Sequence, residues 1–478
     1  MSLEKQEEKI AALEKENQAL PERIAELERR LGIDSQTSSK PPSSDGLKKK
    51  GKKRTKSLRP KGKRQTGGQK GHPGKTLEQV LEPDFRVNHS APNSCSGCGF
   101  DVKKENIISV LKRQVFDIPE PRMLVTEHRV EVKQCPQCQQ RVQGSFPDHV
   151  TAPVQYGVRI KAVSAYLHHQ HFIPEDRLSE ALQDLFNCGM TPGTIANTTK
   201  ALAQNISPVV DKLASTIKAS PVKHLDETGL RIAGKTHWLH VISTQTATWY
   251  RPARKRKHLD PLVDITGVLI HDHWKPYYQL ENAIHGLCNA HHLRELKALE
   301  EIEQESWATR MRKLLSLACN YQHRYPKGIP QSIVVRITQL YQQIIARGLN
   351  FHDSLPPLTR KSNRGRVKRR VGHNLLLRLK DYAADVLRFL IEPQVPFTNN
   401  QAERDLRMIE CKQRCDPAPL QGARERAPRE KISGSFRSFD SAISLAKIRS
   451  FLSTARKQNF NLLEVLTQAL LGETSVFS

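Results

Sequence analysis

Apolar residues recur at alternating steps of three and four near the start of the chain. The series consists of Ile10, Leu13, Asn17, Leu20, Ile24, Leu27 and Leu31. This spacing is typical of a coiled-coil seam, in which a polar Asn can fix register and dimer state. Pro21 interrupts it, because an interior proline removes a helical hydrogen bond. We predict a short coiled coil over residues 1–34, or alternatively an amphipathic helix that packs on its own protein.

A second helical pattern extends from Gly157 to Ser220. One apolar stripe in it consists of Leu178, Ala181, Leu182 and Leu185. A turn is expected at Asn187-Cys188-Gly189, and Thr191-Pro192 offers N-cap and first-position chemistry for the next helix. We therefore interpret residues 151–220 as a helix-turn-helix-like candidate for DNA binding. Any helical hairpin gives the same outline.

Short β-rich runs begin after Pro221. Val222–Asp226 and Gly267–Asp272 are expected to be strands that each end in an aspartate. Between them we expect β-rich runs at 230–233, 236–242 and 247–250, and a helix at 257–265. A fifth strand is expected at 284–288. Three strands, a helix and a fourth strand are typical of the opening of a ribonuclease-H-like α/β domain, which we place at 221–410.

The rest of this domain has a helical pattern. We expect a largely helical insertion at about 293–391, followed by a closing helix over Asn399–Glu410 that carries Glu403. Residues 411–478 are expected to form an extra loop and a C-terminal helical region. The fold class is therefore an α/β core with a helical insertion, preceded by a coiled coil, a linker and two small modules.

The distribution of charge along the chain indicates that the protein binds nucleic acid. The chain has 478 residues, with 76 Lys and Arg against 49 Asp and Glu, a net charge of +27. Thirteen of the basic residues and no acid lie in 48–75, within a Ser/Pro- and Lys/Arg-rich linker at 35–78. Such an arm suits phosphate backbones, although a solubilising or targeting tail is the alternative. A second basic run spans 360–370. Our candidate DNA-binding residues are Lys48, Lys49, Lys50, Lys52, Lys53, Arg54, Arg360, Arg364, Arg366 and Arg369.

The composition also excludes several protein classes. No apolar run approaches the roughly 18 residues of a membrane span, so no membrane partner is expected. The first residues lack a signal-peptide pattern, which favours a cytoplasmic, nucleoid-associated protein. In that compartment the nine cysteines should be thiols or metal ligands rather than disulfides.

Four of the cysteines have the spacing of a zinc site. Cys95 and Cys98 form one Cys-x2-Cys pair, and 36 residues separate it from the pair Cys135 and Cys138. Four thiolates suit a tetrahedral structural Zn²⁺. Residues 124–133 alternate partly, as a β-ribbon between the pairs would. We predict a zinc-ribbon-like module at 79–150; two unrelated thiol pairs are the alternative.

Three acids could hold a second kind of metal. Asp226 and Asp272 are predicted at strand ends and Glu403 on a helix, so a folded core can bring them to one point. Hard ions such as Mg²⁺ or Mn²⁺ prefer carboxylate oxygens, and a pair of ions can clamp a phosphodiester. Acids at strand ends are also common as surface turn residues.

Another possible metal site lies at Cys288, His291 and His292. Three potential ligands within five residues on one turn are geometrically awkward. We therefore favour a structural or substrate-contact role for them. Trp238, Trp249 and Trp274 are interpreted as core aromatics rather than base-stacking platforms.

Several longer sequence motifs resemble those of one protein family. They are Ser39-Lys-Pro-Pro-Ser-Ser-Asp-Gly46, Gly67-Gly-Gln-Lys-Gly-His-Pro-Gly74, His224-Leu-Asp-Glu-Thr228, Cys288-Asn-Ala-His291 with Arg294, Asn399-Asn-Gln-Ala-Glu-Arg404 and Ile432-Ser-Gly-Ser-Phe-Arg-Ser438. Together with the paired cysteines, they resemble transposases of the insertion-sequence-66 type, members of the DDE superfamily. The resemblance implies that Asp226, Asp272 and Glu403 are the catalytic triad. One departure is the extra stretch between Gln413 and Lys431, which we expect to be an exposed loop.

The resemblance predicts a DNA transposase that binds the ends of its element and performs metal-dependent strand cleavage and strand transfer. Its cofactors would be Mg²⁺ or Mn²⁺ and a structural Zn²⁺. Its partners would be double-stranded DNA, as element ends and target, further copies of itself on that DNA and possible companion proteins. A catalytically inactive, zinc-containing DNA-binding derivative is the first alternative. A metal-dependent ribonuclease is the second.

Overall fold

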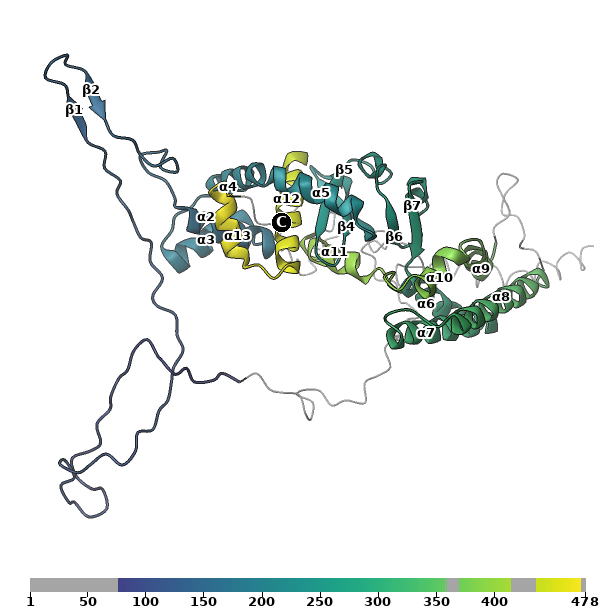
Figure 1. Ribbon diagram of the computed structural model, residues 1–478, viewed down its shortest axis with the longest axis horizontal. Coiled ribbons are helices and arrows are strands. Elements are labelled where there is room, and N and C mark those ends of the chain that lie inside the picture. The colour runs from purple at the N-terminus through teal and green to yellow at the C-terminus, as the bar shows by residue number, and fades with distance from the viewer. Residues whose placement is uncertain (1–75, 357, 359–368, 414–435, 474–478) are drawn as a thin grey trace, which may run out of the picture.

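The computed structural model describes residues 76–356, 358, 369–413 and 436–473 (Figure 1). The predicted coiled coil, the basic arm with Lys48, Lys49, Lys50, Lys52, Lys53 and Arg54, the extra stretch after Gln413, and Arg360, Arg364 and Arg366 lie outside these residues. None of the helices in the described part of the chain has the length and apolar character that crossing a bilayer requires.

A five-stranded mixed sheet lies at the centre of the molecule, with strand order β5-β4-β3-β6-β7 (Figure 1). Its strands are β3 (Val222–Ile232), β4 (Lys235–Ser243), β5 (Thr248–Ala253), β6 (Gly267–His271) and β7 (Ala283–Leu287). The pairs β3/β4 and β4/β5 are antiparallel, whereas β3/β6 and β6/β7 are parallel. The parallel pairs set the two predicted aspartate-bearing strands side by side.

The first strand is longer than the sequence indicated. We expected it to end at Asp226 and a separate run to begin at Leu230, but β3 continues to Ile232. The reason is its partner β4, which pairs with it without interruption from His224 to Ile232. The two strands join through Ala233 and Gly234, whose φ angles of 46° and 75° suit a tight hairpin turn.

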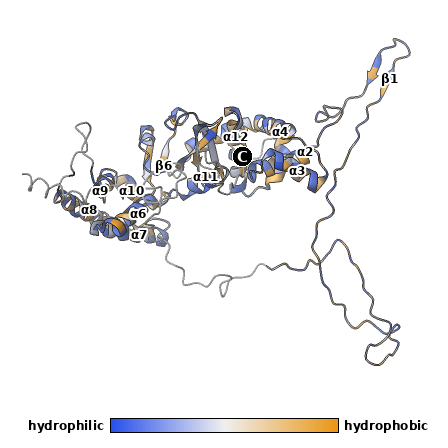
Figure 2. Ribbon diagram, turned by 180° about the vertical axis from the view of Figure 1, so that it is seen from behind, coloured by the Kyte–Doolittle hydropathy of each residue, from blue (hydrophilic) through white to orange (hydrophobic). Residues whose placement is uncertain are grey.

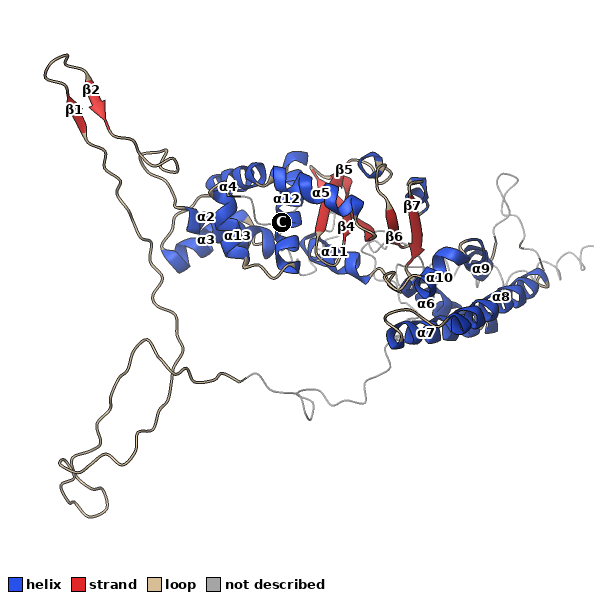
Figure 3. Cartoon of the chain, in the orientation of Figure 1, coloured by secondary structure: helices blue, strands red, loops and turns tan. Residues whose placement is uncertain are grey.

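Two other expected elements are shorter than predicted. The expected helix at 257–265 is only a 3-10 turn, Asp260–Leu262, although the apolar residues that suggested it, Leu259, Leu262 and Ile265, are all buried. Buried apolar residues spaced by three therefore occur here without a continuous helix. Of the expected ribbon at 124–133, only the last two residues lie in a strand, β1 (Val132–Gln134), because its partner β2 (Arg141–Gln143) is three residues long. Elsewhere between residue 76 and the first described helix the chain is loop (Figure 3).

The predicted helical segment before the sheet is confirmed. It contains α2 (Val158–Ala165), a π-helical turn (Tyr166–Gln170), α3 (Glu175–Phe186), α4 (Pro192–Asn205) and α5 (Ser207–Ala219). Asn187 ends α3 in the left-handed conformation, and the Thr191 side chain accepts a hydrogen bond from the Thr194 N–H at the start of α4, as its sequence predicts. The α3–α4 pair remains compatible with both a helix-turn-helix and an ordinary hairpin.

Different helices cover the two faces of the sheet. On one face, α5 packs on alternate residues of β3, β4 and β6, including Leu225, Ile242 and Leu269. On the other face, α11 (Asn400–Gln413) and α12 (Phe439–Lys457) cover β4 and β5. The C-terminal helices α12 and α13 (Leu462–Leu470) also share a core with α2 and α4 (Figure 1).

The predicted helical insertion follows β7 and is confirmed as helical. It consists of α6 (Asn289–Ala298), a π-helical turn (Leu299–Glu303), α7 (Ser306–Arg324), α8 (Gln331–Asp353), α9 (Val371–Asp381) and α10 (Ala383–Ile391). These helices share one core with Val268, Ile270 and Leu287 of the sheet. They show both polar and apolar residues (Figure 2), as expected for helices with one face in a core.

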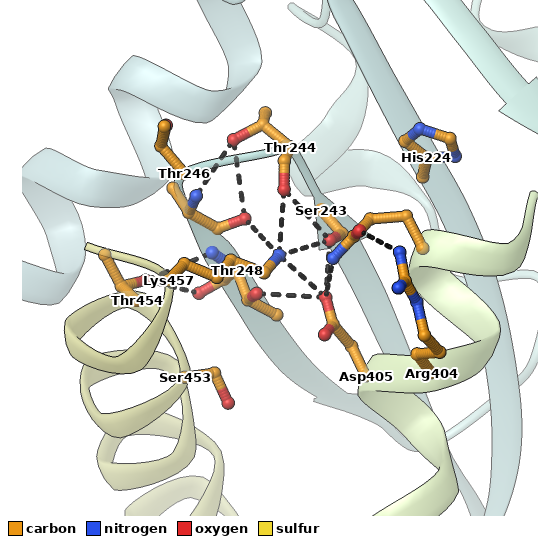
Figure 4. Close-up of polar contacts among 12 residues, drawn as sticks. His224, Ser243, Thr244, Thr246, Thr248, Arg404, Asp405, Ser453, Thr454 and Lys457 are labelled. Atoms are coloured by element: carbon orange, nitrogen blue, oxygen red, sulfur yellow. Dashed lines mark hydrogen bonds and ion pairs between the residues drawn. The ribbon is translucent and has the colours of Figure 1, made fainter. Parts of the chain in front are cut away.

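A buried ion pair holds α11 against the sheet (Figure 4). Lys457 of α12 donates to Asp405 of α11 at 2.8 Å, and their side chains are 12% and 13% exposed. Asp405 also accepts from Ser243 and from Thr248 at 3.0 Å, on both sides of the β4–β5 turn. Lys457 donates in addition to two backbone carbonyls of that turn, at 2.8 and 3.0 Å. The contacts fix the rotation of α11 and hence the position of every side chain on it.

We predict that Lys457→Met lowers the free energy of unfolding by about 3 kcal/mol, because Asp405 would remain buried without its cation. Arg456→Met, at the exposed neighbour, should cost under about 0.5 kcal/mol. The double variant Asp405→Asn/Lys457→Met should be more stable than Lys457→Met alone, since no buried charge is left unpaired. Chemical denaturation of the full chain measures all three. Equal losses of unfolding free energy in Lys457→Met and Arg456→Met would show that the ion pair does not hold α11.

Candidate active site

Asp226 lies on β3, and Asp272 lies at the corresponding level directly after the neighbouring strand β6. The register of the parallel pair β3/β6 ends at His224 opposite Ile270, and each aspartate follows two residues later. Because side chains two apart share a face of a strand, the Asp226 carboxylate lies on the same face as His224, where its β4 partner Val241 packs with α11. Both aspartates are half-buried. The structure therefore brings these two predicted site residues together.

The surroundings of these aspartates disfavour their charged forms. Burial, followed by the charges of Glu227, Asp272 and Glu403, raises the pKa of Asp226 well above its ordinary value. Burial and the charge of Glu227 raise the pKa of Asp272 to about 7, although the Trp274 N–H donates to its carboxylate at 3.1 Å. Among the described residues, no ion pair involves either aspartate. This oxygen-rich, negative donor set fits a divalent cation such as Mg²⁺.

Glu227 lies next to Asp226 on the strand but on the opposite face. Its side chain is 1% exposed and forms an ion pair with Arg256. Tyr277 donates to its second carboxylate oxygen at 2.5 Å. The Arg256 guanidinium lies over the rings of Trp238 and Trp274, 5.0 and 4.5 Å from their centroids. These contacts fix the backbone that carries Asp226.

Sequence reasoning missed this support. Glu227 was visible only as the acid beside Asp226, and strand alternation indicates that it faces away from the aspartate. Arg256 and Tyr277 lie 29 and 50 positions along the chain, with no spacing rule that connects them to Glu227. Only the folded sheet makes them neighbours.

Asn399 places the start of α11 beside Asp226. Its side-chain amide donates to the Leu225 carbonyl at 2.7 Å, and its Oδ1 lies 3.0 Å from the His224 ring nitrogen. Its backbone N–H donates to the Cys288 thiol at 3.1 Å. Glu403 follows in the first turn of α11, as the sequence predicted. Its position is therefore tied to both β3 and the start of α6.

The Glu403 carboxylate lies close enough to raise the pKa of Asp226, but it has other neighbours. It lies 3.5 Å from Arg294 and 3.9 Å from the His291 ring nitrogen, both on α6. Among the described residues, the group of potential ligands whose atoms all lie within 4.8 Å of one another is Cys288, His291 and Glu403. The three acids are thus brought to one region without being gathered that tightly.

The two Cys-x2-Cys pairs adopt the same tight turn. The thiols of Cys95 and Cys135 each accept backbone N–H groups from the two residues that close their own turn, which lowers the pKa of both thiols. Gly99 and Gln139, directly after the turns, have φ angles of 76° and 59°. Each turn presents two thiols in the manner of half a zinc site. The structure does not bring the two halves together within the described residues.

Of the candidate DNA-binding residues, Arg369 lies within the described part of the chain. It is exposed and lies two positions before the first residue of α9. Its surroundings therefore leave a phosphate contact open to it.

Comparison with known families agrees with this arrangement. The sequence model described as the transposase IS66 family matches residues 153–417, which include the sheet, the helical insertion and α11. The zinc-finger binding domain of transposase IS66 matches residues 92–139, which contain all four paired cysteines. A family of unknown function matches residues 2–78, and no curated protein matches the chain. The transposase match spans more than half of the sequence, and the chain therefore belongs to the IS66 family of transposases.

Proposed function

We propose that this transposase binds the ends of an insertion sequence and catalyses metal-dependent DNA strand cleavage and strand transfer. One observation carries the proposal: Asp226 on β3 and Asp272 directly after the neighbouring strand β6 lie close enough for the charge of Asp272 to raise the pKa of Asp226, and neither forms an ion pair among the described residues. Like charges held this close favour a cation between them. The family supports a metal-dependent enzyme acting on nucleic acid.

In this proposal Asp226, Asp272 and Glu403 hold Mg²⁺ or Mn²⁺. Such ions stabilise the attacking and leaving oxygens of a phosphodiester. Asp226 and Asp272 supply fixed oxygens, because β3 and β6 set their spacing, and Glu403 completes the set by turning from Arg294. A water and then a DNA 3′-hydroxyl attack phosphorus in line, without a covalent protein intermediate.

The finer architecture is part of the same proposal. An antiparallel β3–β4–β5 meander, with β6 and β7 added parallel to β3, supports a ribonuclease-H-like core despite the missing helix before β6. Cys95, Cys98, Cys135 and Cys138 would bind one structural Zn²⁺, and the basic residues would contact DNA phosphates. Self-association would use the predicted coiled coil. The proposed domains and linkers of the chain are residues 1–34, 35–78, 79–150, 151–220, 221–410 and 411–478.

We predict that Glu403→Gln reduces strand cleavage by about two orders of magnitude or more, because it removes a charge that the metal requires. DNA binding should persist. The matched control is Glu464→Gln, which changes an exposed acid in the first turn of α13. A cleavage assay on the element's own ends measures both. Near-normal cleavage by Glu403→Gln would exclude Glu403 from the reaction, and no cleavage by the unaltered chain would favour the inactive derivative.

A metal-free chain should reveal the strain between the aspartates through pH. The pKa of Asp272 is raised to about 7, so its contribution to stability is present at low pH and is lost as pH rises through about 7. Without metal, Asp272→Asn should therefore stabilise the protein at about pH 8, on the order of 2 kcal/mol, and change little near pH 4.

Thermal unfolding in chelator, with and without added Mg²⁺, measures this difference. Added Mg²⁺ should stabilise the unaltered chain at about pH 8 and have a much smaller effect on Asp272→Asn. Asp381→Asn, at an exposed acid of α9, is the control and should follow the unaltered chain. A pH-independent difference between Asp272→Asn and the unaltered chain would contradict the prediction.

We also predict that the paired cysteines hold one tightly bound zinc per chain. It should survive dialysis against a weak chelator and be lost from Cys135→Ser/Cys138→Ser, because two thiolates cannot replace four. Cys188→Ser, at a buried thiol before α4, should keep the zinc. Elemental analysis gives the stoichiometry. A double variant with the same zinc content as the unaltered chain would show that the two turns do not share an ion.

A further inference from the structure

We propose that Cys288, His291 and Glu403 form a second metal site, which takes a soft or borderline transition ion such as Zn²⁺ or Co²⁺. The site is distinct from the four paired cysteines. It shares Glu403 with the proposed magnesium site, and only this sharing rests on the proposed function.

The distances approach those of a coordinated ion. One ligand atom from each residue lies within 4.8 Å of the other two, and His291 Nδ1 lies 3.9 Å from Glu403 Oε1. Bonds of 2.0–2.3 Å from zinc to its ligands place neighbouring tetrahedral ligands roughly 3.5 Å apart. Side-chain movements of about 1 Å would therefore close the site around an ion.

The backbone explains why two of the ligands lie together. Cys288 is the N-cap of α6 and His291 is in its first turn, three positions later, so both side chains lie on one face of the helix. The sequence offered His292 as the third ligand, and three ligands on the same turn are geometrically awkward. His292 is in fact buried and lies 3.1 Å from Asn289 Oδ1. Glu403 supplies the third ligand from α11, which removes the geometric objection.

Two further observations indicate a ligand at this position. The Nδ1 atom of His291 is buried and has no hydrogen-bond partner, which is costly for a polar atom. The Cys288 thiol is 1% exposed and accepts the Asn399 N–H, a contact that would stabilise a thiolate bound to metal. A bound ion would satisfy the first atom and use the second. The thiol proton would be released to solvent on binding.

Arg294 disfavours the binding of a cation at this site. Its guanidinium lies 3.5 Å from Glu403, where it partly neutralises the carboxylate and repels a cation. Glu403 can thus pair with Arg294, join the soft ion or join Asp226 and Asp272. A soft ion at Cys288 and His291 would hold Glu403 away from the aspartates and inhibit magnesium-dependent cleavage.

Cobalt titration of the full chain that carries a single equivalent of zinc, enough for the paired cysteines alone, tests the site, because Co²⁺ bound to a thiolate absorbs in the near ultraviolet. We expect added Co²⁺ to produce this band in the unaltered chain and in Cys188→Ala, whose buried thiol lies away from the site. The band should be absent from Cys288→Ala, and His291→Gln should weaken binding about tenfold or more. Comparing the two cysteine variants removes any signal from the paired cysteines, which both retain.

Arg294→Met provides a test that loss of folding cannot imitate. Removing the competing cation should tighten Co²⁺ binding about tenfold, and the band should still depend on Cys288. Equal bands in Cys288→Ala and Cys188→Ala, or unchanged affinity in Arg294→Met, would overturn the site. If Co²⁺ binds as expected but no condition yields strand cleavage, the site stands and the proposed function falls. If strand cleavage proceeds but Co²⁺ gives no Cys288-dependent band, the proposed function stands and the second metal site falls.

Discussion

Asn399 joins three parts of the chain that are distant in sequence. Its amide donates to β3, its carbonyl oxygen faces His224, and its backbone N–H donates to Cys288 at the start of α6. The residue is 1% exposed, so water does not compete for these bonds. Glu403 follows one turn later, and its distance from both Asp226 and Cys288 is set by this junction. Without it, α11 would have packing against the sheet but no defined start.

Around this junction the fold separates charges that are neutralised from charges that are not. Glu227 is paired with Arg256 on one face of the sheet, and Asp405 is paired with Lys457 on the other. Both pairs are largely buried and hydrogen-bonded, as buried charges must be. Asp226 and Asp272, by contrast, have no ion pair among the described residues. The surrounding pairs fix the backbone, so the two aspartates cannot simply move apart.

The sequence predicted most elements that carry the site and few of the contacts that shape it. Asp272 after an apolar strand and Glu403 on the closing helix follow from local periodicity, which the structure confirms. The position of Asp226 within a long strand does not, because β3 extends through its pairing with β4. The ion pair of Glu227 and the return of Glu403 to His291 join residues 29 and over 100 positions apart. Such pairings depend on tertiary packing, which local periodicity does not encode.

The packing of α12 and α13 against α2 and α4 has a consequence for synthesis. Asn205 in α4 donates to the Ala469 carbonyl in α13, 264 positions later, and the core around it joins residues of α2 and α4 to residues of α12 and α13. The ribosome must therefore synthesise the chain through α13 before this core can close. Until then the apolar faces of α2 and α4 stay uncovered, which favours aggregation of the unfinished chain. A message cut short before α12 yields a chain that cannot complete this core, however intact its sheet.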